Sequence, residues 1–232
     1  MEDIRARAAR NNAAWCDIVS RSHGLRTRFD DDAWTSETRT PPRYPDAVTL
    51  VPGVSVPDLL TRIDTSEGCS IKDSFASLDL SAHGFHVLFE AQWIARSGAS
   101  PGPDEARPAW ERVRSAGGFA DWERAWRGDG DPADVLRPKL IDDESIAVLA
   151  ARTNDQVVAG AILNASESVV GISNFFTTST DDSDCWSGCI ARAESLFPAT
   201  TFVGYESGSA LTAALEHGFQ IAGPLRVWTN EG

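Results

Sequence analysis

The sequence is poor in cysteine and has no long apolar run. It holds four cysteines without a C-x-x-C pair, and Cys185 and Cys189 stand four residues apart with no matching second pair. Zinc sites and disulfide frameworks use paired spacings, so the sequence argues against both and no metal is expected. No stretch approaches the roughly 20 apolar residues of a membrane helix, and the first ten residues carry charges where a signal peptide has an apolar core. We therefore expect a cytoplasmic protein with no membrane partner.

Basic residues are scarce as well. The chain has 21 Lys and Arg against 34 Asp and Glu, which gives a formal net charge of -13. A surface of this sign repels phosphate backbones, so nucleic acid is not an expected partner. The excess is uneven, because residues 104–232 carry 20 acidic and 10 basic side chains while residues 1–103 carry 14 and 11.

The composition is otherwise that of a folded globular protein, with 42% hydrophobic and 24% charged residues. Residues 97–103 read Ser-Gly-Ala-Ser-Pro-Gly-Pro, and small residues with two prolines leave little to bury. This segment predicts a linker. It divides the chain into an N-terminal α+β half at residues 1–100 and a second domain at residues 104–232.

The N-terminal half shows one clear helix and several strand patterns. Apolar residues recur with helical spacing over residues 3–23, and Gly24 follows as a stop. Residues 47–51 favour a strand. Residues 70–80 and 85–94 are also predicted to be strands, and the turn between them indicates an antiparallel hairpin.

Residues 104–144 are rich in tryptophan. Trp110, Trp122 and Trp126 indicate a helical region that is interrupted at Gly117 and Gly118. A segment of this length cannot bury enough surface to be stable alone. We therefore expect the three tryptophans to pack onto the sheet formed by the residues that follow.

The last part of the chain has a regular pattern. Apolar alternation predicts strands at 146–151, 157–163, 169–176, 201–205 and 219–228, and helical spacing predicts helices at 185–196 and 209–217. The order is β-β-β-α-β-α-β. A meander followed by crossover connections predicts one mixed sheet with two helices.

Three phrases in this region resemble a known family. They are VLAARTNDQVVAGAILN at 148–164, VVGISNFF at 169–176 and LEHGFQIAGPLRVW at 215–228, the last with the His-Gly-Phe turn into the closing strand. Together they resemble the GNAT (GCN5-related N-acetyltransferase) superfamily. The resemblance implies an α/β layered fold with a mixed sheet flanked by helices. It also suggests that residues 1–100 form a degenerate unit of the same kind, as in tandem members.

The resemblance implies that the strands at 169–176 and 201–205 are neighbours that diverge at one end. It also implies acetyl-CoA or another acyl-CoA as co-substrate, held between these two strands. The cofactor-binding positions would be Ile172, Ser173, Asn174, Phe175 and Phe176 on the strand and Trp186, Ser187 and Gly188 on the helix after it. The family's Gly-rich diphosphate loop is not matched here. Asp181, Asp182 and Asp184 occupy its place, and such residues cap a helix well but repel phosphate.

The position of the family's general-acid tyrosine falls on Ala214, so we assign catalysis to Tyr205, Glu206 and Asn174. The expected function is transfer of an acetyl or longer acyl group from a thioester to an amine of a small molecule. Two alternatives remain open. One is a catalytically silent GNAT-like binding or regulatory module, and the other is an enzyme whose donor is carried by an acyl carrier protein.

Overall fold

The computed structural model describes residues 3–98, 109–128, 134–166, 168–178 and 182–231, without the side chains of 182–184. In these residues the chain forms five α-helices, two 3-10 helices and eleven strands with both parallel and antiparallel pairing. The predicted layered α/β class with a mixed sheet is confirmed. None of the described helices is long and apolar enough to cross a membrane.

The chain folds as two compact units whose limits differ from the predicted linker. Unit 1 holds residues 1–93 and 222–232, and unit 2 holds residues 94–221. The end of the chain belongs to unit 1 because its last strand pairs with a strand of that unit. Residues 99–103 of the predicted linker lie outside the described residues. The ranges 1–100 and 104–232 therefore do not coincide with the compact units, and their independence as domains stays a prediction.

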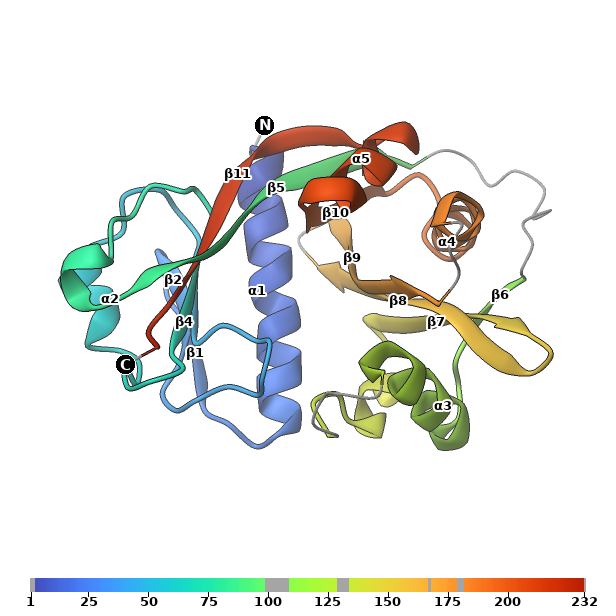
Figure 1. The fold of residues 1–232 in the computed structure, drawn as a ribbon, viewed down its shortest axis with the longest axis horizontal. Coiled ribbons are helices and arrows are strands. Elements are labelled where there is room, and N and C mark those ends of the chain that lie inside the picture. The colour runs from blue at the N-terminus through green and yellow to red at the C-terminus, as the bar shows by residue number, and fades with distance from the viewer. Residues whose placement is uncertain (1–2, 99–108, 129–133, 167, 179–181, 232) are drawn as a thin grey trace. The chain divides into compact units, whose positions relative to one another are not determined.

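Unit 1 combines one long helix with four short strands and most of the two long strands β5 and β11 (Figure 1). Its elements are α1 (Ile4–Ser22), β1 (Thr27–Phe29), β2 (Ala33–Ser36), β3 (Ala47–Thr49), α2 (Val56–Leu60), β4 (Ser70–Asp73), η1 (Ser81–His83), most of β5 (His86–Ser97) and most of β11 (Gln220–Thr229). Asp3 begins α1 by accepting the N–H of Arg5 at 3.1 Å. The buried face of α1, which includes Trp15 and Val19, packs on β1, β2 and β3.

The strands of unit 1 follow the order β1-β2-β3-β4-β11-β5. β3 and β4 are parallel, and β4 pairs antiparallel with β11, so that Asp73 lies opposite Arg226. The predicted hairpin of residues 70–80 with 85–94 is therefore wrong, because β11 lies between β4 and β5. β4 also ends early, since the Asp73 carboxylate accepts the N–H groups of Phe75 (3.2 Å) and Leu78 (2.8 Å) and turns the chain.

Unit 2 has helices on both faces of its strands (Figure 1). Its elements are the end of β5, β6 (Trp110–Arg112), α3 (Ala116–Arg127), η2 (Pro138–Asp142), β7 (Ile146–Thr153), β8 (Gln156–Ser166), β9 (Val169–Thr177), α4 (Asp182–Leu196), β10 (Thr201–Glu206), α5 (Gly208–Glu216) and the start of β11. The strand order is β5-β10-β9-β8-β7-β6. The predicted order β-β-β-α-β-α-β is confirmed for the last part of the chain.

The tryptophans of residues 104–144 pack on this sheet, as predicted, but not all from a helix. Trp110 lies in the edge strand β6, opposite Ala151 of β7. Trp122 of α3 is fully buried and donates its indole N–H to the carbonyl oxygen of Leu149 at 2.8 Å, and Trp126 stacks on Trp122. The predicted interruption at residues 117–118 is wrong, because both glycines lie in the first turn of α3.

Candidate active site

The parallel strands β9 and β10 pair over only part of their lengths. Their ladder joins Thr201 to Val169, Phe202 to Val170 and Val203 to Gly171, and it stops there although β9 runs on to Thr177. The predicted divergence of these two strands is confirmed. Beyond Gly171 the edge of β9 that faces β10 is free of strand pairing, so an extended ligand could pair along it.

A bulge in β9 falls inside this unpaired half. The register with β8 passes from Ile162 opposite Ser173 to Gly160 opposite Phe176, so three steps on β9 match two on β8. Asn174 occupies the extra position with a left-handed backbone, φ 53°. A bulge takes a residue out of the ladder and redirects its peptide groups. The bulge thus gives Asn174 a local conformation that its neighbours on β9 do not share.

The residues after the bulge point to opposite faces of the sheet. Phe175 stacks on Trp186 of α4 with ring centroids 4.2 Å apart. Phe176 lies on the other face, where its ring meets Trp122 of α3 edge to face at 5.4 Å. On this second face Gly160 is required, because a Cβ there would lie 2.2 Å from the Trp122 indole nitrogen.

Trp186 forms the centre of a row of rings on the α4 face. Besides Phe175, it stacks on His217 at 6.5 Å and meets Phe219 edge to face at 5.8 Å, while Trp110 stacks on the far side of Phe175 at 6.4 Å. Trp186 is 3% exposed. The row therefore packs tightly beside the diverging part of β9.

The predicted cofactor positions fall in different surroundings. Ile172 is buried, the other strand positions from Ser173 to Phe176 are half-buried, and Ser173 donates its hydroxyl hydrogen to the carbonyl oxygen of Ile162 at 3.5 Å. On α4, Trp186 and Gly188 are buried while Ser187 is exposed. The structure thus brings the strand positions and Trp186 together, and Ser187 points away from them.

The acidic segment before and within α4 can be followed only in part. Asp181 lies outside the described residues, and Asp182 and Asp184 belong to the first turn of α4 without described side chains. Their relation to a ligand stays a prediction. The cysteines of this helix are buried, and burial raises the pKa of the Cys189 thiol, which disfavours a reactive thiolate.

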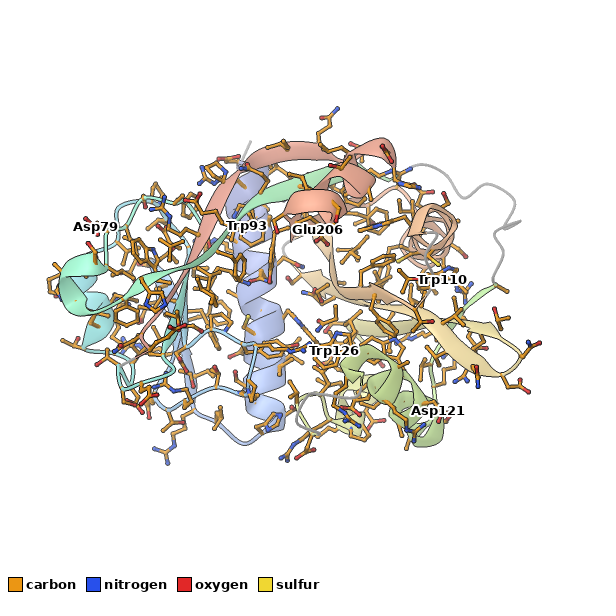
Figure 2. The ribbon with its side chains drawn as sticks, viewed as in Figure 1. Asp79, Trp93, Trp110, Asp121, Trp126 and Glu206 are labelled. Atoms are coloured by element: carbon orange, nitrogen blue, oxygen red, sulfur yellow. The ribbon has the colours of Figure 1, made fainter. Side chains whose placement is uncertain are left out.

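Glu206 and Tyr205 end β10, the strand that diverges from β9. Both are half-buried, and as neighbours on a strand they point to opposite faces. Burial raises the pKa of the Glu206 carboxyl from its ordinary value to about 7. A carboxyl that titrates near neutral pH is suited to accept a proton. Figure 2 shows Glu206 at the end of its strand.

Ala214 is fully buried in α5 and offers no proton-transfer group, as the sequence implied. Sequence reasoning missed an ion pair that joins the surrounding elements of unit 2. Arg96 of β5 pairs with Glu194 of α4 and donates its Nε hydrogen to the carbonyl oxygen of His217, 3.1 Å away, at the end of α5. The pair thereby ties α4 and α5 to one strand. No local sequence signal connects positions so far apart.

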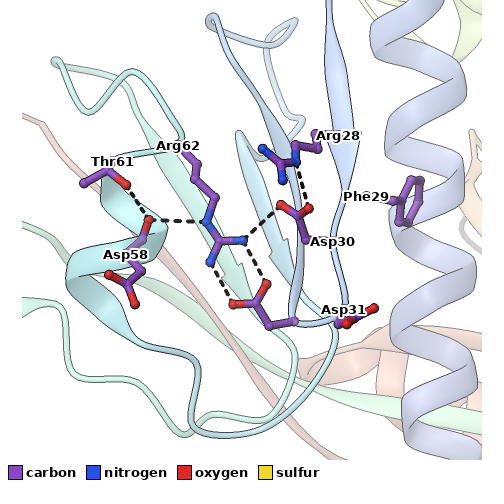
Figure 3. A pocket seen from close by; sticks show the side chains of 8 residues that line it. Arg28, Phe29, Asp30, Asp31, Asp58, Thr61 and Arg62 are labelled. Atoms are coloured by element: carbon purple, nitrogen blue, oxygen red, sulfur yellow. Dashed lines mark hydrogen bonds and ion pairs between the residues drawn. The ribbon is translucent and has the colours of Figure 1, made fainter.

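Unit 1 has an open cavity of about 550 Å³, which Figure 3 shows from close by. Arg62 lies among acidic side chains there and forms a two-pronged pair with Asp32, at 2.8 and 2.7 Å, and a longer contact of 3.3 Å with Asp30. The arginine and the two aspartates of this cavity therefore largely neutralise one another. In the described part of the chain, no group of three or more His, Cys, Asp or Glu side chains could hold a metal ion.

Comparison with solved structures identifies the fold. A GCN5-related N-acetyltransferase from Kribbella flavida matches with a TM-score of 0.65 and 16% identity, over 97% of this chain and 96% of that one. A GCN5-related N-acetyltransferase-like protein from Streptococcus suis matches with a TM-score of 0.53 and 15% identity, over 97% of each chain. A Novosphingobium aromaticivorans protein described as a GNAT-family acetyltransferase matches with a TM-score of 0.58 and 10% identity, over 97% of this chain and 99% of that one.

The predicted resemblance is thus confirmed at the level of the fold. The matches cover nearly the whole chain, so both units take part in the likeness. No family model and no curated protein sequence matches this chain. At identities of 10–16% the likeness gives the GNAT fold and leaves the reaction to be argued from the site.

Proposed function

We propose that this chain is an acyltransferase that moves an acetyl or longer acyl group from a CoA thioester to an amine of a small molecule. The observation that carries the proposal is the end of the β9–β10 ladder at Gly171 and Val203, which leaves an unpaired strand edge beside a titratable carboxyl on β10. The acetyltransferase-type fold of the structural neighbours supports it.

In the proposed reaction Glu206 acts as general base. It removes a proton from the acceptor's ammonium group, and the resulting amine attacks the thioester carbonyl carbon. The tetrahedral adduct loses the extra proton of its nitrogen and expels the thiolate as the C–S bond breaks, which leaves the amide. The thiolate takes up the proton that the nitrogen gives up. Tyr205, the predicted donor of this proton, ends the same strand but points to the opposite face from Glu206, so its role stays a prediction. Asn174 would hold the carbonyl oxygen of the thioester through the peptide that its bulge turns out of the β8 ladder.

The residues present fit an acyl-CoA in part. The free edge of β9 from Ser173 onward suits an extended amide-containing arm, because its backbone groups are not paired with β10. The start of α4 suits the diphosphate poorly, because the sequence there supplies Asp181, Asp182 and Asp184 and no basic residue. A carrier-protein thioester would avoid this conflict, since it presents the same arm without a free diphosphate.

The first experiment measures free thiol release from acetyl-, butyryl- and octanoyl-CoA with a panel of primary amines. Glu206→Gln should lower turnover by about 10²–10⁴-fold while retaining donor binding. Glu216→Gln is a matched control because Glu216 is exposed at the end of α5. Turnover that Glu206→Gln leaves intact would remove the proposed base and with it the assignment of the site.

The second candidate function is a catalytically silent GNAT-like binding or regulatory module. The 4.2 Å stacking of Phe175 on Trp186 favours it, because rings this close leave no room for a ligand between them. The melting temperature with and without acetyl-CoA separates the two candidates. A ligand at 100 times its Kd adds about 2.7 kcal/mol and raises the melting temperature by several degrees. Absence of any shift would favour the silent module or a carrier-bound donor.

A further inference from the structure

The first half of β5 exposes an apolar run. Val87, Leu88 and Phe89 are 40%, 53% and 38% exposed, and the exposed polar residues His86 and Glu90 flank them. Among the described residues six large apolar side chains are exposed, and three of them are consecutive here. Single exposed apolar residues are normal, whereas a contiguous group indicates a surface that a partner covers. We call these five residues the exposed segment.

Both faces of the exposed segment are open. Alternate residues of a strand point to opposite faces, so Val87 and Phe89 lie on one face and Leu88 lies on the other. Further along the same strand both rows are covered, because Trp93 and Ile94 are buried. The first half of β5 therefore lacks the packing that the second half has.

β11 runs along one edge of the exposed segment. Arg226 of β11 donates two hydrogen bonds to Glu90, at 2.9 and 2.6 Å, and the His86 ring nitrogen Nε2 lies 3.2 Å from the carboxylate of Glu231, just after β11. Both bonds from Arg226 end on the same oxygen, Oε1. The other carboxylate oxygen of Glu90 is therefore left to accept a further hydrogen bond.

β10 lies along the other edge of β5, but only beside its second half. The Gly98 N–H donates to the carbonyl oxygen of Thr200 at 2.9 Å, and a Cβ on Gly204 would lie 3.9 Å from a side-chain carbon of Ile94. These contacts show that the two strands run antiparallel. β10 ends two residues after Gly204, which places its end beside Gln92. Among the described residues β5 has only β11 and β10 as strand neighbours, so this edge of the exposed segment is left unpaired.

The order of side chains in the exposed segment is self-complementary. If two copies pair antiparallel about a two-fold axis at Leu88, His86 of each copy lies opposite Glu90 of the other, and Val87 lies opposite Phe89. Residues directly opposite one another in an antiparallel pair share a face. An imidazole N–H can then donate to the carboxylate, and a β-branched residue meets an aromatic one, which is a favourable cross-strand pair.

We propose that two copies of this chain associate through the exposed segment, which pairs antiparallel with itself about Leu88. Unpaired strand edges attract further strands, and natural proteins protect them with Pro or Lys, neither of which occurs in the segment. A two-fold pairing occupies both edges and therefore closes at the dimer. Five residues from each copy are fewer than the roughly 20–30 of a stable interface, so we expect a weak dimer with a Kd of about 10–100 μM. The association is independent of the acyl-transfer proposal.

The test is sedimentation velocity of the full chain at concentrations between about 1 and 300 μM, a range that brackets the expected Kd. A reversible shift from monomer to dimer is expected as the concentration rises. A monomer over the whole range would overturn the proposal and leave the exposed segment to a different partner. Growth beyond the dimer would overturn it too, because an open series of contacts is not a two-fold pairing.

Charge variants give the proposed register a signature. His86→Glu places a carboxylate opposite Glu90 of the other copy, twice in each dimer, and should weaken association about 10-fold, because like charges directly opposite are destabilising. Adding Glu90→Lys to the same chain restores opposite charges and should return the Kd to within about 3-fold of the wild type.

His83→Glu is the matched control for these variants. It makes the same change of charge at an exposed histidine three residues away, outside the exposed segment, and should leave association unchanged. Equal weakening by His83→Glu and His86→Glu would overturn the proposal, and so would a double variant that stays as weak as His86→Glu. The substituted side chains are all exposed, and unchanged melting temperatures would show that each variant is folded.

Discussion

The two units share one connectivity but differ in the lengths of the strands and helices that it joins. In unit 1 the meander β1-β2-β3 crosses through α2 to the parallel strand β4, and in unit 2 the meander β7-β8-β9 crosses through α4 to the parallel strand β10. β3 has three residues and β9 has nine, while α2 has five and α4 has fifteen. β9 runs from Ile172 to Thr177 past its ladder with β10, whereas β3 runs past its ladder with β4 by Thr49 alone, so the long unpaired stretch beside the parallel partner belongs to unit 2.

The acidic residues that end the two parallel strands differ in their surroundings. Asp73 ends β4 and Glu206 ends β10. The Asp73 carboxylate is fully buried and accepts two backbone N–H groups. Glu206 makes no hydrogen bond with the other described residues, and burial raises the pKa of its carboxyl. One connectivity therefore places a structural carboxylate in unit 1 and a titratable one in unit 2. The idea that residues 1–100 are a degenerate copy gains support from this parallel and stays a prediction.

The largest expected effect is the loss of acyl-transfer activity when Glu206, the titratable carboxyl group, is replaced. Glu206→Gln should lower kcat/KM for acyl transfer by about 10²–10⁴-fold, because a general base contributes a factor of this size. In the wild type, kcat/KM should rise with pH to a plateau with an apparent pKa near 7, since the base form is the active one. Steady-state kinetics between pH 5.5 and pH 9 would measure both. A flat profile would show that Glu206 does not act as the base.

The second effect is on stability and belongs to unit 1. Asp73→Ala leaves the N–H groups of Phe75 and Leu78 without their acceptor, at a cost of about 2–4 kcal/mol in the free energy of unfolding. Urea unfolding monitored by circular dichroism would measure it. Asp79→Ala is the control, because Asp79 accepts the Ser81 N–H at the exposed surface. If the two variants lost the same stability, the buried role of Asp73 would be refuted.

The sequence indicated most of unit 2 because its patterns are local. The apolar run from Val169 predicts β9, and Gly218 after a helical pattern predicts the end of α5. The start of α4 and the length of β10 also came within a few residues of the structure. Divergence of β9 from β10 was expected only from the family resemblance.

What the sequence could not supply are pairings between distant segments. No local signal places β11 between β4 and β5, so the hairpin at residues 70–94 was the natural prediction. Trp110 belongs to a three-residue edge strand, which is too short for a period to be read. The raised pKa of Glu206 arises from burial. Each depends on the folded arrangement.

The third prediction concerns the pH dependence of stability. The pKa of Glu206 is about 7 in the folded chain and 4.5 as the reference value, so the folded state binds the proton more tightly. Wild-type stability should therefore fall as pH rises from 4.5 to 7, with the full penalty present above 7. Glu206→Gln does not titrate and should be more stable than wild type at pH 8 by about 1–3 kcal/mol, allowing for partial exposure, and equally stable near pH 4.

The control for this comparison is Glu216→Gln, whose exposed side chain should give no pH-dependent difference. Thermal or urea unfolding at pH 4, 6 and 8 would measure all three proteins. A difference between Glu206→Gln and wild type that is the same at every pH would mean that the carboxyl is not desolvated in the folded chain.

The smallest expected effect concerns the crossover helices, which begin with acidic residues in both units. α2 carries Asp58 in its first turn, and α4 follows Asp181 and begins at Asp182 with Asp184 behind it. If acyl-CoA binds along β9, changing Asp181, Asp182 and Asp184 together to Asn should raise its affinity severalfold. The reason is that each change removes a like charge worth about 0.3–1 kcal/mol near a helix start while Asn keeps a capping oxygen.

The salt dependence of CoA binding tests the same repulsion. Wild-type affinity should improve as salt screens the repulsion, and the triple variant should lose this dependence. Asp58→Asn should change nothing, because Asp58 lies on the helix that follows β3 and not on the one that follows β9. Equal CoA affinity in the triple variant and the wild type would place the diphosphate away from α4 and favour a carrier-bound donor or the silent module.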